Sequence, residues 1–140
     1  MQTVSVERDL DGDADAVRDA MADVEAFMLA AGFDVVTVED DAIHLENRVG
    51  IATLQLDLRI VDGDGDLEYV QEDGIFREMR TSYHLEPTPN GATITATTDF
   101  AVDVSLVGEL LDATVIKRQR RKELNAQFDY LERVAAGEPA

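Results

Sequence analysis

The sequence contains no cysteine and no tryptophan, and only three of its 140 residues are prolines. Without cysteine the chain forms no disulfides, thiolate nucleophiles or iron–sulfur clusters, and it lacks the usual ligands of structural zinc sites. It has no apolar run close to the roughly 20 residues of a membrane helix, and its start, MQTVSVERD, has no signal-peptide core. We therefore expect no stable membrane insertion and a cytoplasmic location.

Basic residues are also scarce, because 12 lysines and arginines stand against 30 aspartates and glutamates, for a formal net charge of −18. Lysine occurs only at Lys117 and Lys122. Such a charge repels phosphate polyanions and predicts no nucleic-acid partner. At about 1 M salt the Debye length falls to about 3 Å, and this self-repulsion is screened. We interpret the aspartate-rich, lysine-poor composition as that of a salt-accumulating halophile of the archaeal type.

The remaining composition is that of a folded protein, with 45% hydrophobic and 30% charged residues. A chain of this length buries enough apolar surface for one core. We therefore predict a single domain over residues 1–140, in which residues 137–140 form a frayed tail.

Hydrophobic periodicity divides most of the chain into strands and helices. Residues 3–10 alternate as a half-buried strand. Residues 14–31 show helical spacing, which we interpret as two short helices broken near Asp23, and Gly32 is placed to end them. Six further strands are predicted at residues 33–39, 42–47, 52–60, 67–71, 75–86 and 92–104.

The last segment, residues 107–136, returns to helical spacing, with Leu124, Phe128 and Leu131 in its apolar stripe. Strands joined by short turns pair in antiparallel fashion, since parallel pairing needs long crossover connections. An antiparallel sheet with one apolar face buries that face against a long amphipathic helix. The predicted fold class is therefore α+β.

Two local patterns add a resemblance to a known family. Residues 23–27, Asp-Val-Glu-Ala-Phe, resemble the Asp-Val-x-x-aromatic stretch in the early helices of the START-like superfamily, also called SRPBCC. Residues 106–111, Leu-Val-Gly-Glu-Leu-Leu, followed by Arg120, Leu124 and Asn125, resemble its last-helix pattern. The superfamily includes polyketide cyclases/dehydrases, lipid-transport proteins and coenzyme-Q-binding proteins. The order of elements along the whole chain is similar to theirs.

The resemblance implies a helix-grip fold. In this fold a curved antiparallel sheet of about seven strands wraps around a long C-terminal helix, and two short helices follow the first strand. It also implies a cavity between the sheet and the C-terminal helix. A small apolar or amphipathic molecule would occupy that cavity.

Strand phase and the helix stripe predict which side chains face the cavity. Thr81, Tyr83 and Thr98 bring polar tips to an inward phase, suited either to orienting a ligand or to an internal hydrogen bond. Arg8 and Arg77 also fall on inward phases, so they either reach water at strand ends or serve as polar anchors in the cavity. The predicted ligand-binding residues are Leu56, Leu58, Arg77, Met79, Thr81, Tyr83, Ala96, Thr98, Leu111, Thr114 and Arg121.

The run from Lys117 to Lys122 holds five of the 12 basic residues and no acidic residue. Counting back from Leu124 in the apolar stripe by three and then four residues places Arg121 and Lys117 on or near the buried side of the helix. The run either offsets the surrounding acidity through surface ion pairs, each of small energy, or binds an anionic group. In the second case the group is a ligand headgroup at the cavity mouth or an acidic protein partner.

The sequence contains no pattern that requires catalysis or metal binding. Asp62, Asp64 and Asp66 alternate as at the start of a calcium loop, but the glycine that such a loop needs is missing, which favours a solvated turn. His44 and His84 fall on the polar phases of their strands and are interpreted as surface residues. Neither a nucleotide-binding loop nor an activated-serine motif is present. We predict no catalytic residue, no metal and no cofactor.

Three functions remain open. The first is binding or transport of a small hydrophobic ligand, such as a lipid, an isoprenoid quinone or a polyketide-like molecule. The second is a cyclase/dehydratase-type enzyme that uses a carboxylate, tyrosine or histidine as general acid or base. The third is a protein-binding module without a functional cavity. The sequence favours the first, so we expect a binding protein rather than an enzyme.

The net charge predicts that stability depends on salt. As KCl falls from molar to millimolar concentration, the melting temperature should fall, because the screening of like charges is lost. Thermal melts over a KCl series measure this directly. A melting temperature that stays flat or rises at low salt would contradict the halophile interpretation.

Overall fold

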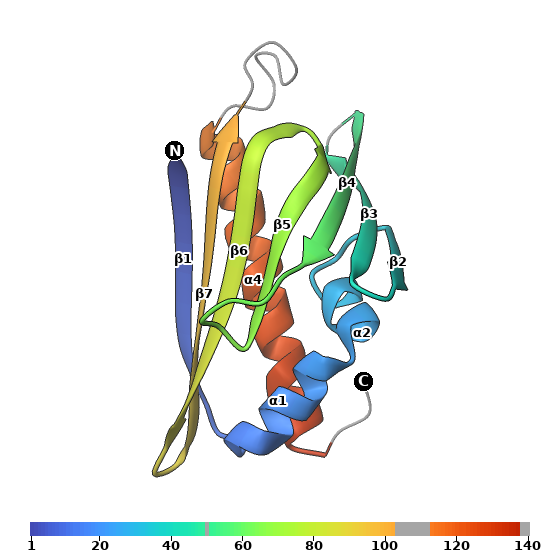
Figure 1. The fold of residues 1–140 in the computed structure, drawn as a ribbon. Coiled ribbons are helices and arrows are strands. Elements are labelled where there is room, and N and C mark those ends of the chain that lie inside the picture. The colour runs from blue at the N-terminus through green and yellow to red at the C-terminus, as the bar shows by residue number, and fades with distance from the viewer. Residues whose placement is uncertain (50, 103–112, 138–140) are drawn as a thin grey trace.

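The computed structural model of the chain describes residues 1–49, 51–102 and 113–137 (Figure 1). Strand β1 (Gln2–Leu10) leads into two short helices, α1 (Ala14–Ala22) and α2 (Val24–Leu29). The strands that follow are β2 (Val35–Glu39), β3 (Ala42–Val49), β4 (Ala52–Ile60), β5 (Leu67–Gly74), β6 (Phe76–Thr88) and β7 (Gly91–Val102). The long helix α4 (Ala113–Ala135) comes last.

The strands form one antiparallel seven-stranded sheet in the order β1-β7-β6-β5-β4-β3-β2. Strand β1 therefore pairs with β7, while every other pair of neighbours is consecutive in the chain. In Figure 1 the sheet curves around α4, and α1 and α2 lie across its lower end. The predicted α+β class, with a sheet wrapped around the C-terminal helix, is confirmed.

The break between α1 and α2 occurs at Asp23, as the sequence predicts. The Asp23 side chain accepts a hydrogen bond from Ala26 N (3.3 Å), and its carbonyl oxygen accepts one from Phe27 N (2.9 Å). An aspartate at this position satisfies N–H groups of the first turn, so a new helix starts here. Gly32 follows with a φ of 103°, a left-handed conformation that glycine adopts without steric cost.

The core lies between the concave face of the sheet and α4. Alternate residues of β7, such as Ile94 and Ala96, are completely buried, as period-two patterning requires. Leu124, Phe128 and Leu131 of α4 are also completely buried, at spacings of four and three residues. The apolar stripe predicted for the second half of this helix is therefore the face that packs on the sheet.

Arg8 connects β1 to α4. Its guanidinium donates to Asp129 Oδ1 (2.6 Å) and Asn125 Oδ1 (3.0 Å), and its Cζ atom lies 5.6 Å from the ring centre of Phe128. An inward-phase arginine needs such partners, because an unpaired buried charge is costly. Arg8 thus holds the first strand against the helix and does not line the cavity described below.

The inward position predicted for Arg77 is wrong. The register of β6 with β7 shifts between Phe76 and Glu78, so Arg77 has no residue opposite it. A bulge of this kind interrupts the alternation of a strand, and the Arg77 side chain is exposed. Beyond the bulge, Met79 keeps its predicted inward phase and is buried.

Some predicted boundaries differ from the structure or fall outside it. Strand β5 continues to Gly74, beyond its predicted end at residue 71. Leu111 and the predicted helix start at residue 107 lie outside the described residues, as do residues 138–140 of the predicted tail. Among the helices that the structure describes, none has both the length and the apolar character needed to cross a membrane.

The aspartate-rich turn at residues 62–66 contributes to the fold through its last member. Asp66 accepts hydrogen bonds from Leu85 N (2.7 Å) and from Arg18 Nε (3.2 Å). These bonds tie the turn to β6 and to α1. Within the described part of the chain, no three histidine, aspartate or glutamate side chains are arranged to hold a metal ion.

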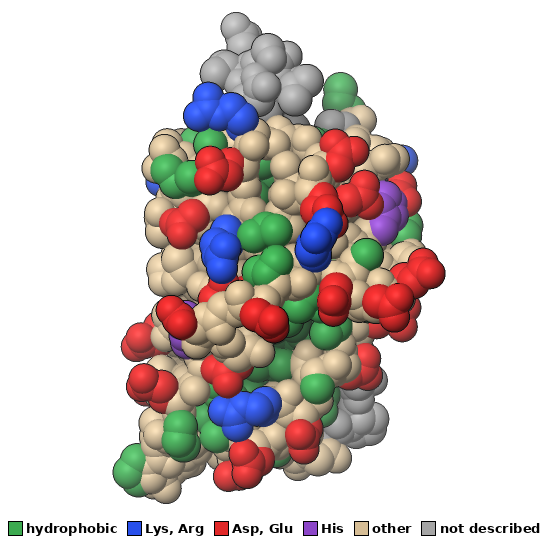
Figure 2. Space-filling view, viewed as in Figure 1, with side chains coloured by type: hydrophobic (Ala, Val, Ile, Leu, Met, Phe, Trp, Pro, Cys, Tyr) green, Lys and Arg blue, Asp and Glu red, His purple; other side chains and the backbone are tan. Residues whose placement is uncertain are grey.

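The outer surface is strongly acidic. Aspartate and glutamate side chains are spread over the face in Figure 2 and are more numerous there than basic ones. His44 lies on the outer face of β3, with Asp57 2.7 Å from Nδ1 and Glu46 3.3 Å from Nε2. The hydrogen bond to Asp57 raises the pKa of His44 above its usual value of 6.5. His84 is exposed, so the surface positions predicted for both histidines are confirmed.

Candidate functional site

A cavity of about 70 Å³ lies between the N-terminal half of α4 and strands β3 to β7. It is smaller than the roughly 300–1,000 Å³ of pockets for drug-sized ligands, so its size suits a small ring or a short chain. Most of the lining is apolar: Phe33, Leu45, Leu54, Leu56, Leu58, Ile75, Phe76, Met79, Phe100, Val115 and Ile116. Several of these side chains are only half-buried, so the cavity is partly open to solvent.

Strand and helix periodicity place these side chains together. Leu54, Leu56 and Leu58 occupy alternate positions of β4, which point to one face of the sheet. On α4, Ile116 and Arg120 are four residues apart and therefore lie on one face of the helix. The same face of α4 that packs in the core thus forms the cavity wall nearer its N-terminus.

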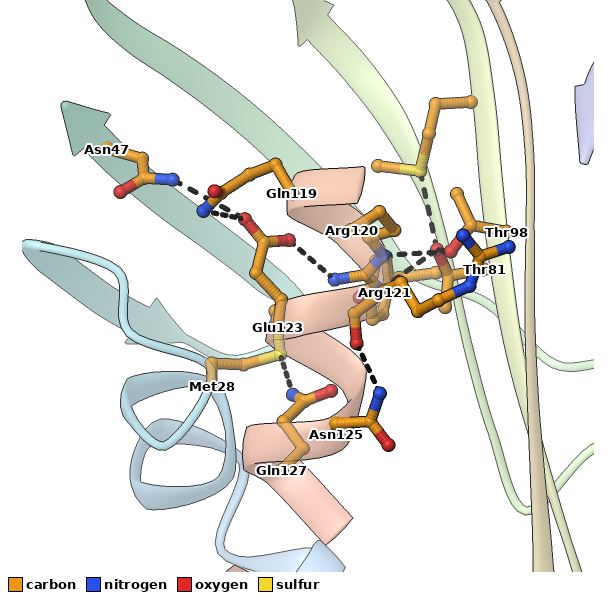
Figure 3. Close-up of polar contacts among 12 residues, drawn as sticks. Met28, Asn47, Thr81, Thr98, Gln119, Arg120, Arg121, Glu123, Asn125 and Gln127 are labelled. Carbon is orange, nitrogen blue, oxygen red and sulfur yellow. Dashed lines mark hydrogen bonds and ion pairs between the residues drawn. The ribbon is translucent and has the colours of Figure 1, made fainter. Parts of the chain in front are cut away.

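Arg120 forms a polar inner wall of the cavity. Its Nε donates to Thr98 Oγ1 (2.9 Å), its Nη1 to Glu123 Oε1 (3.1 Å) and its Nη2 to Tyr69 Oη (2.6 Å). Nη2 also lies 3.4 Å from Thr81 Oγ1. Figure 3 shows the Arg120 side chain reaching from α4 toward Thr81 and Thr98 on the sheet.

Glu123 balances the charge of Arg120 from the next turn of the helix. The two side chains are 7% and 10% exposed, so the ion pair is buried. Glu123 Oε2 also accepts from Asn47 Nδ2 (3.4 Å) and Gln119 Nε2 (3.2 Å) (Figure 3). Burial alone would lower the pKa of Arg120, but the nearby oxygens of Tyr69, Tyr83 and Glu123 raise that pKa above its ordinary value. Arg120 is therefore a permanent cation.

A second polar layer lies behind Arg120, on the side toward α2. Tyr83 Oη donates to Gln127 Oε1 (2.7 Å), and Gln127 Nε2 donates to the carbonyl oxygen of Phe27 (3.1 Å). Burial raises the pKa of Tyr83 well above its usual value. Every buried side-chain nitrogen and oxygen of the described residues has a hydrogen-bond partner. This layer is therefore satisfied internally and connects α4 to α2.

Comparisons with known proteins bear on the fold. No protein-family model matches the sequence, and a search of curated proteins finds no related sequence. A START superfamily protein from Mycobacterium smegmatis superposes with a TM-score of 0.72 at 14% identity, over 96% of this chain and 97% of that chain. The Zhui aromatase/cyclase from Streptomyces sp. R1128 superposes with a TM-score of 0.75 at 20% identity, over 99% of both chains. The chain has the helix-grip fold.

The same helix-grip fold is found in a plant protein. Major latex-like protein 151 from Panax ginseng superposes with a TM-score of 0.67 at 10% identity, over 92% of this chain and 96% of that chain. At 10–20% identity these likenesses concern the backbone arrangement. The helix-grip fold implied by the sequence resemblance is thereby confirmed.

Some of the residues predicted from strand phase lie at the cavity. Leu56, Leu58, Met79 and Thr98 line it. Thr81 and Tyr83 do not line it but lie behind Arg120, within hydrogen-bond distance of its Nη2. Whether these residues contact a ligand stays a prediction.

Other predicted residues lie away from the cavity. Ala96 is completely buried and is not in the lining, while Thr114 and Arg77 are exposed. The position of Leu111 falls outside the described residues. A larger side chain at Ala96 would therefore test core packing rather than ligand binding.

The buried side predicted for Arg121 is also wrong. Arg121 is exposed, whereas its neighbour Arg120 is buried and lines the cavity. Arg120 lies four residues after Ile116 and four before Leu124. This i, i+4 spacing to two apolar residues indicates that Arg120 shares their buried face of the helix. Arg118 and Lys122 are exposed, and Lys117 is half-buried. The basic run is therefore divided between the surface and the interior.

The buried ion pair predicts a large effect of removing one charge. Arg120→Met should lower the free energy of unfolding by about 3–5 kcal/mol, because it leaves a carboxylate buried without its partner. The double variant Arg120→Met/Glu123→Leu removes both charges and should lose clearly less. Denaturant unfolding in molar KCl measures both values, and equal losses would contradict this role of the pair.

Proposed function

We propose that the protein binds a small hydrophobic molecule in the cavity between the sheet and α4, and acts as a carrier or sensor. The observation that supports this most directly is the cavity itself, an apolar space that ends on one buried polar wall. An apolar lining with a few convergent polar groups is typical of ligand sites. The apolar body of a ligand would contact Leu56, Leu58 and Met79, and its polar end would face Arg120 and Glu123.

The size and the composition of the cavity limit the ligand. A volume of about 70 Å³ suits a small ring or short chain, or the terminal part of a longer molecule that extends through the open side. Lipids, isoprenoid quinones and polyketide-like molecules each contain such a part. The structural neighbours include a START superfamily protein and an aromatase/cyclase, which supports this class of ligand without naming one.

One contact supports catalysis as a second candidate function. Tyr69 lines the cavity, and its Oη lies 2.6 Å from Arg120 Nη2. Arg120 thus holds the phenol group at the cavity wall, where Tyr69 is positioned to act as general acid or base in a cyclase/dehydratase-type reaction. Binding remains the first proposal, because a carrier requires only the cavity and its polar wall.

Filling the cavity tests the proposed function. In Leu56→Trp the larger ring should occupy the space and weaken toluene binding about tenfold or more, while stability changes by less than about 1.5 kcal/mol, because a void is filled. Gln55→Trp is the matched control, since residue 55 is exposed on the outer face of the same strand and should leave toluene binding unchanged.

Chemical-shift titration with toluene and denaturant unfolding give the two quantities. If toluene does not bind the parent protein and Leu56→Trp is strongly destabilising, the interior is a solid core. The protein-binding interpretation, with an acidic partner at the exposed part of residues 117–122, would then replace ligand binding.

A further inference from the structure

The charge balance at the inner wall of the cavity restricts the chemistry of the ligand. Arg120 contributes one positive charge and Glu123 one negative charge, and their side chains are about nine-tenths buried. The pair is neutral as a whole, so the cavity offers no net charge for an ionised ligand to neutralise. Both charges are also held away from water, where an additional charge would be costly.

We propose that the ligand carries an uncharged oxygen group, a carbonyl or a hydroxyl, on its apolar body, and that Glu123 excludes carboxylates and phosphates. This proposal rests on the proposed ligand-binding function and specifies the polar end of the ligand. It differs from the anionic headgroup that the basic run in the sequence suggests.

The hydrogen bonds of Arg120 leave no fork for an anion. Arginine binds carboxylates and phosphates most strongly through two parallel N–H groups on neighbouring nitrogens. Here Nε, Nη1 and Nη2 each already donate, to Thr98, Glu123 and Tyr69 respectively. The second Nη2 hydrogen has Thr81 Oγ1 and Tyr83 Oη as acceptors, each 3.4 Å from Nη2. Of the five N–H groups, one on Nη1 is then left without a partner among the described residues. A ligand carboxylate at this wall would meet that single N–H group and would lie close to the carboxylate of Glu123.

The remaining donors and acceptors suit a neutral oxygen. Of the two Nη1 hydrogens, one serves Glu123 within the described part of the chain. The amide groups of Asn47 and Gln119 also carry two hydrogens each, and each donates to Glu123 Oε2. A ligand carbonyl or hydroxyl oxygen can accept from these groups, and a ligand hydroxyl can donate to the Glu123 carboxylate.

The exposed arginines do not change this balance. Arg121 and Arg118 point to solvent and are not part of the cavity lining. Their charges are therefore screened by salt, whereas the Arg120–Glu123 pair is screened far less because it is buried. Selection at the cavity wall depends on the buried pair.

A series of probes with one skeleton separates charge from shape. Toluene, benzyl alcohol, acetophenone and benzoate share a six-membered aromatic ring and differ in the attached group. Titrations at about 1 M KCl, where the Debye length is about 3 Å, keep the overall negative charge of the protein from deciding the result. The parent protein should bind benzyl alcohol and acetophenone more tightly than toluene, and benzoate about tenfold or more weakly than benzyl alcohol.

Removing the negative charge of the pair should reverse the selection. In Glu123→Gln the charge of Arg120 becomes available to the ligand, so the affinity of benzoate relative to benzyl alcohol should rise about tenfold or more. Glu86→Gln is the matched control, because it makes the same chemical change at an exposed position of β6 and should leave this ratio unchanged.

A second variant keeps the test decisive if Glu123→Gln does not fold. Arg120→Met/Glu123→Leu leaves no buried charge, and it should bind benzyl alcohol no more tightly than toluene. Equal binding of benzoate and benzyl alcohol by the parent, or an unchanged ratio in Glu123→Gln, overturns the proposed ligand chemistry while toluene binding keeps the cavity function intact. If none of the four probes binds, toluene included, the proposed function fails and this inference fails with it.

Discussion

The burial of the Arg120–Glu123 ion pair is the constraint on which the packing of the N-terminal half of α4 against the sheet depends. A buried guanidinium must be hydrogen-bonded and balanced, and here its partners come from β5, β6 and β7 as well as from α4. The same bonds that satisfy the charge therefore set the position of the helix over the sheet. Apolar side chains cannot replace these partners without leaving N–H groups of the guanidinium unpaired, so the apolar space ends on a polar wall.

The two ends of the fold differ in how completely side chains fill them. Near α1 and α2, side chains such as Phe27, Phe128 and Leu131 are completely buried, and Gln127 hydrogen-bonds to the backbone of α2. At the other end, half-buried side chains such as Leu56 and Phe76 surround a cavity. The packed end supplies the stability that allows the cavity end to remain incompletely filled.

Local patterns predicted much of the fold and part of the candidate site, because Leu56, Leu58, Met79 and Thr98 were all expected to face inward and line the cavity. Alternation predicted the strands because each has one apolar face, and Asp23 and Gly32 marked helix boundaries through local chemistry. The polar wall of the site also depends on charged residues that turn inward, and a pattern that separates apolar from charged residues assigns such residues to the surface. Arg120 and Glu123 are examples, since only the packing of α4 shows that both are buried.

The errors have the same physical origin. Counting from Leu124 by three residues selects Arg121, whereas counting by four selects Arg120, and helical periodicity of 3.6 residues allows either. At Arg77 a bulge shifts the register of β6, which the sequence of that strand does not reveal. In both cases the tertiary structure, rather than the local pattern, decides whether the arginine side chain is buried.

The central claim is that a small apolar molecule occupies the space between the sheet and α4, with its oxygen toward Arg120 and Glu123. The most direct measurement is an isotope-filtered nuclear Overhauser experiment on labelled protein with bound benzyl alcohol. The account predicts contacts from the ring protons to the methyl groups of Leu56, Leu58 and Met79. Contacts only to exposed apolar residues such as Leu29 and Val35 would place the molecule outside the cavity and contradict the account.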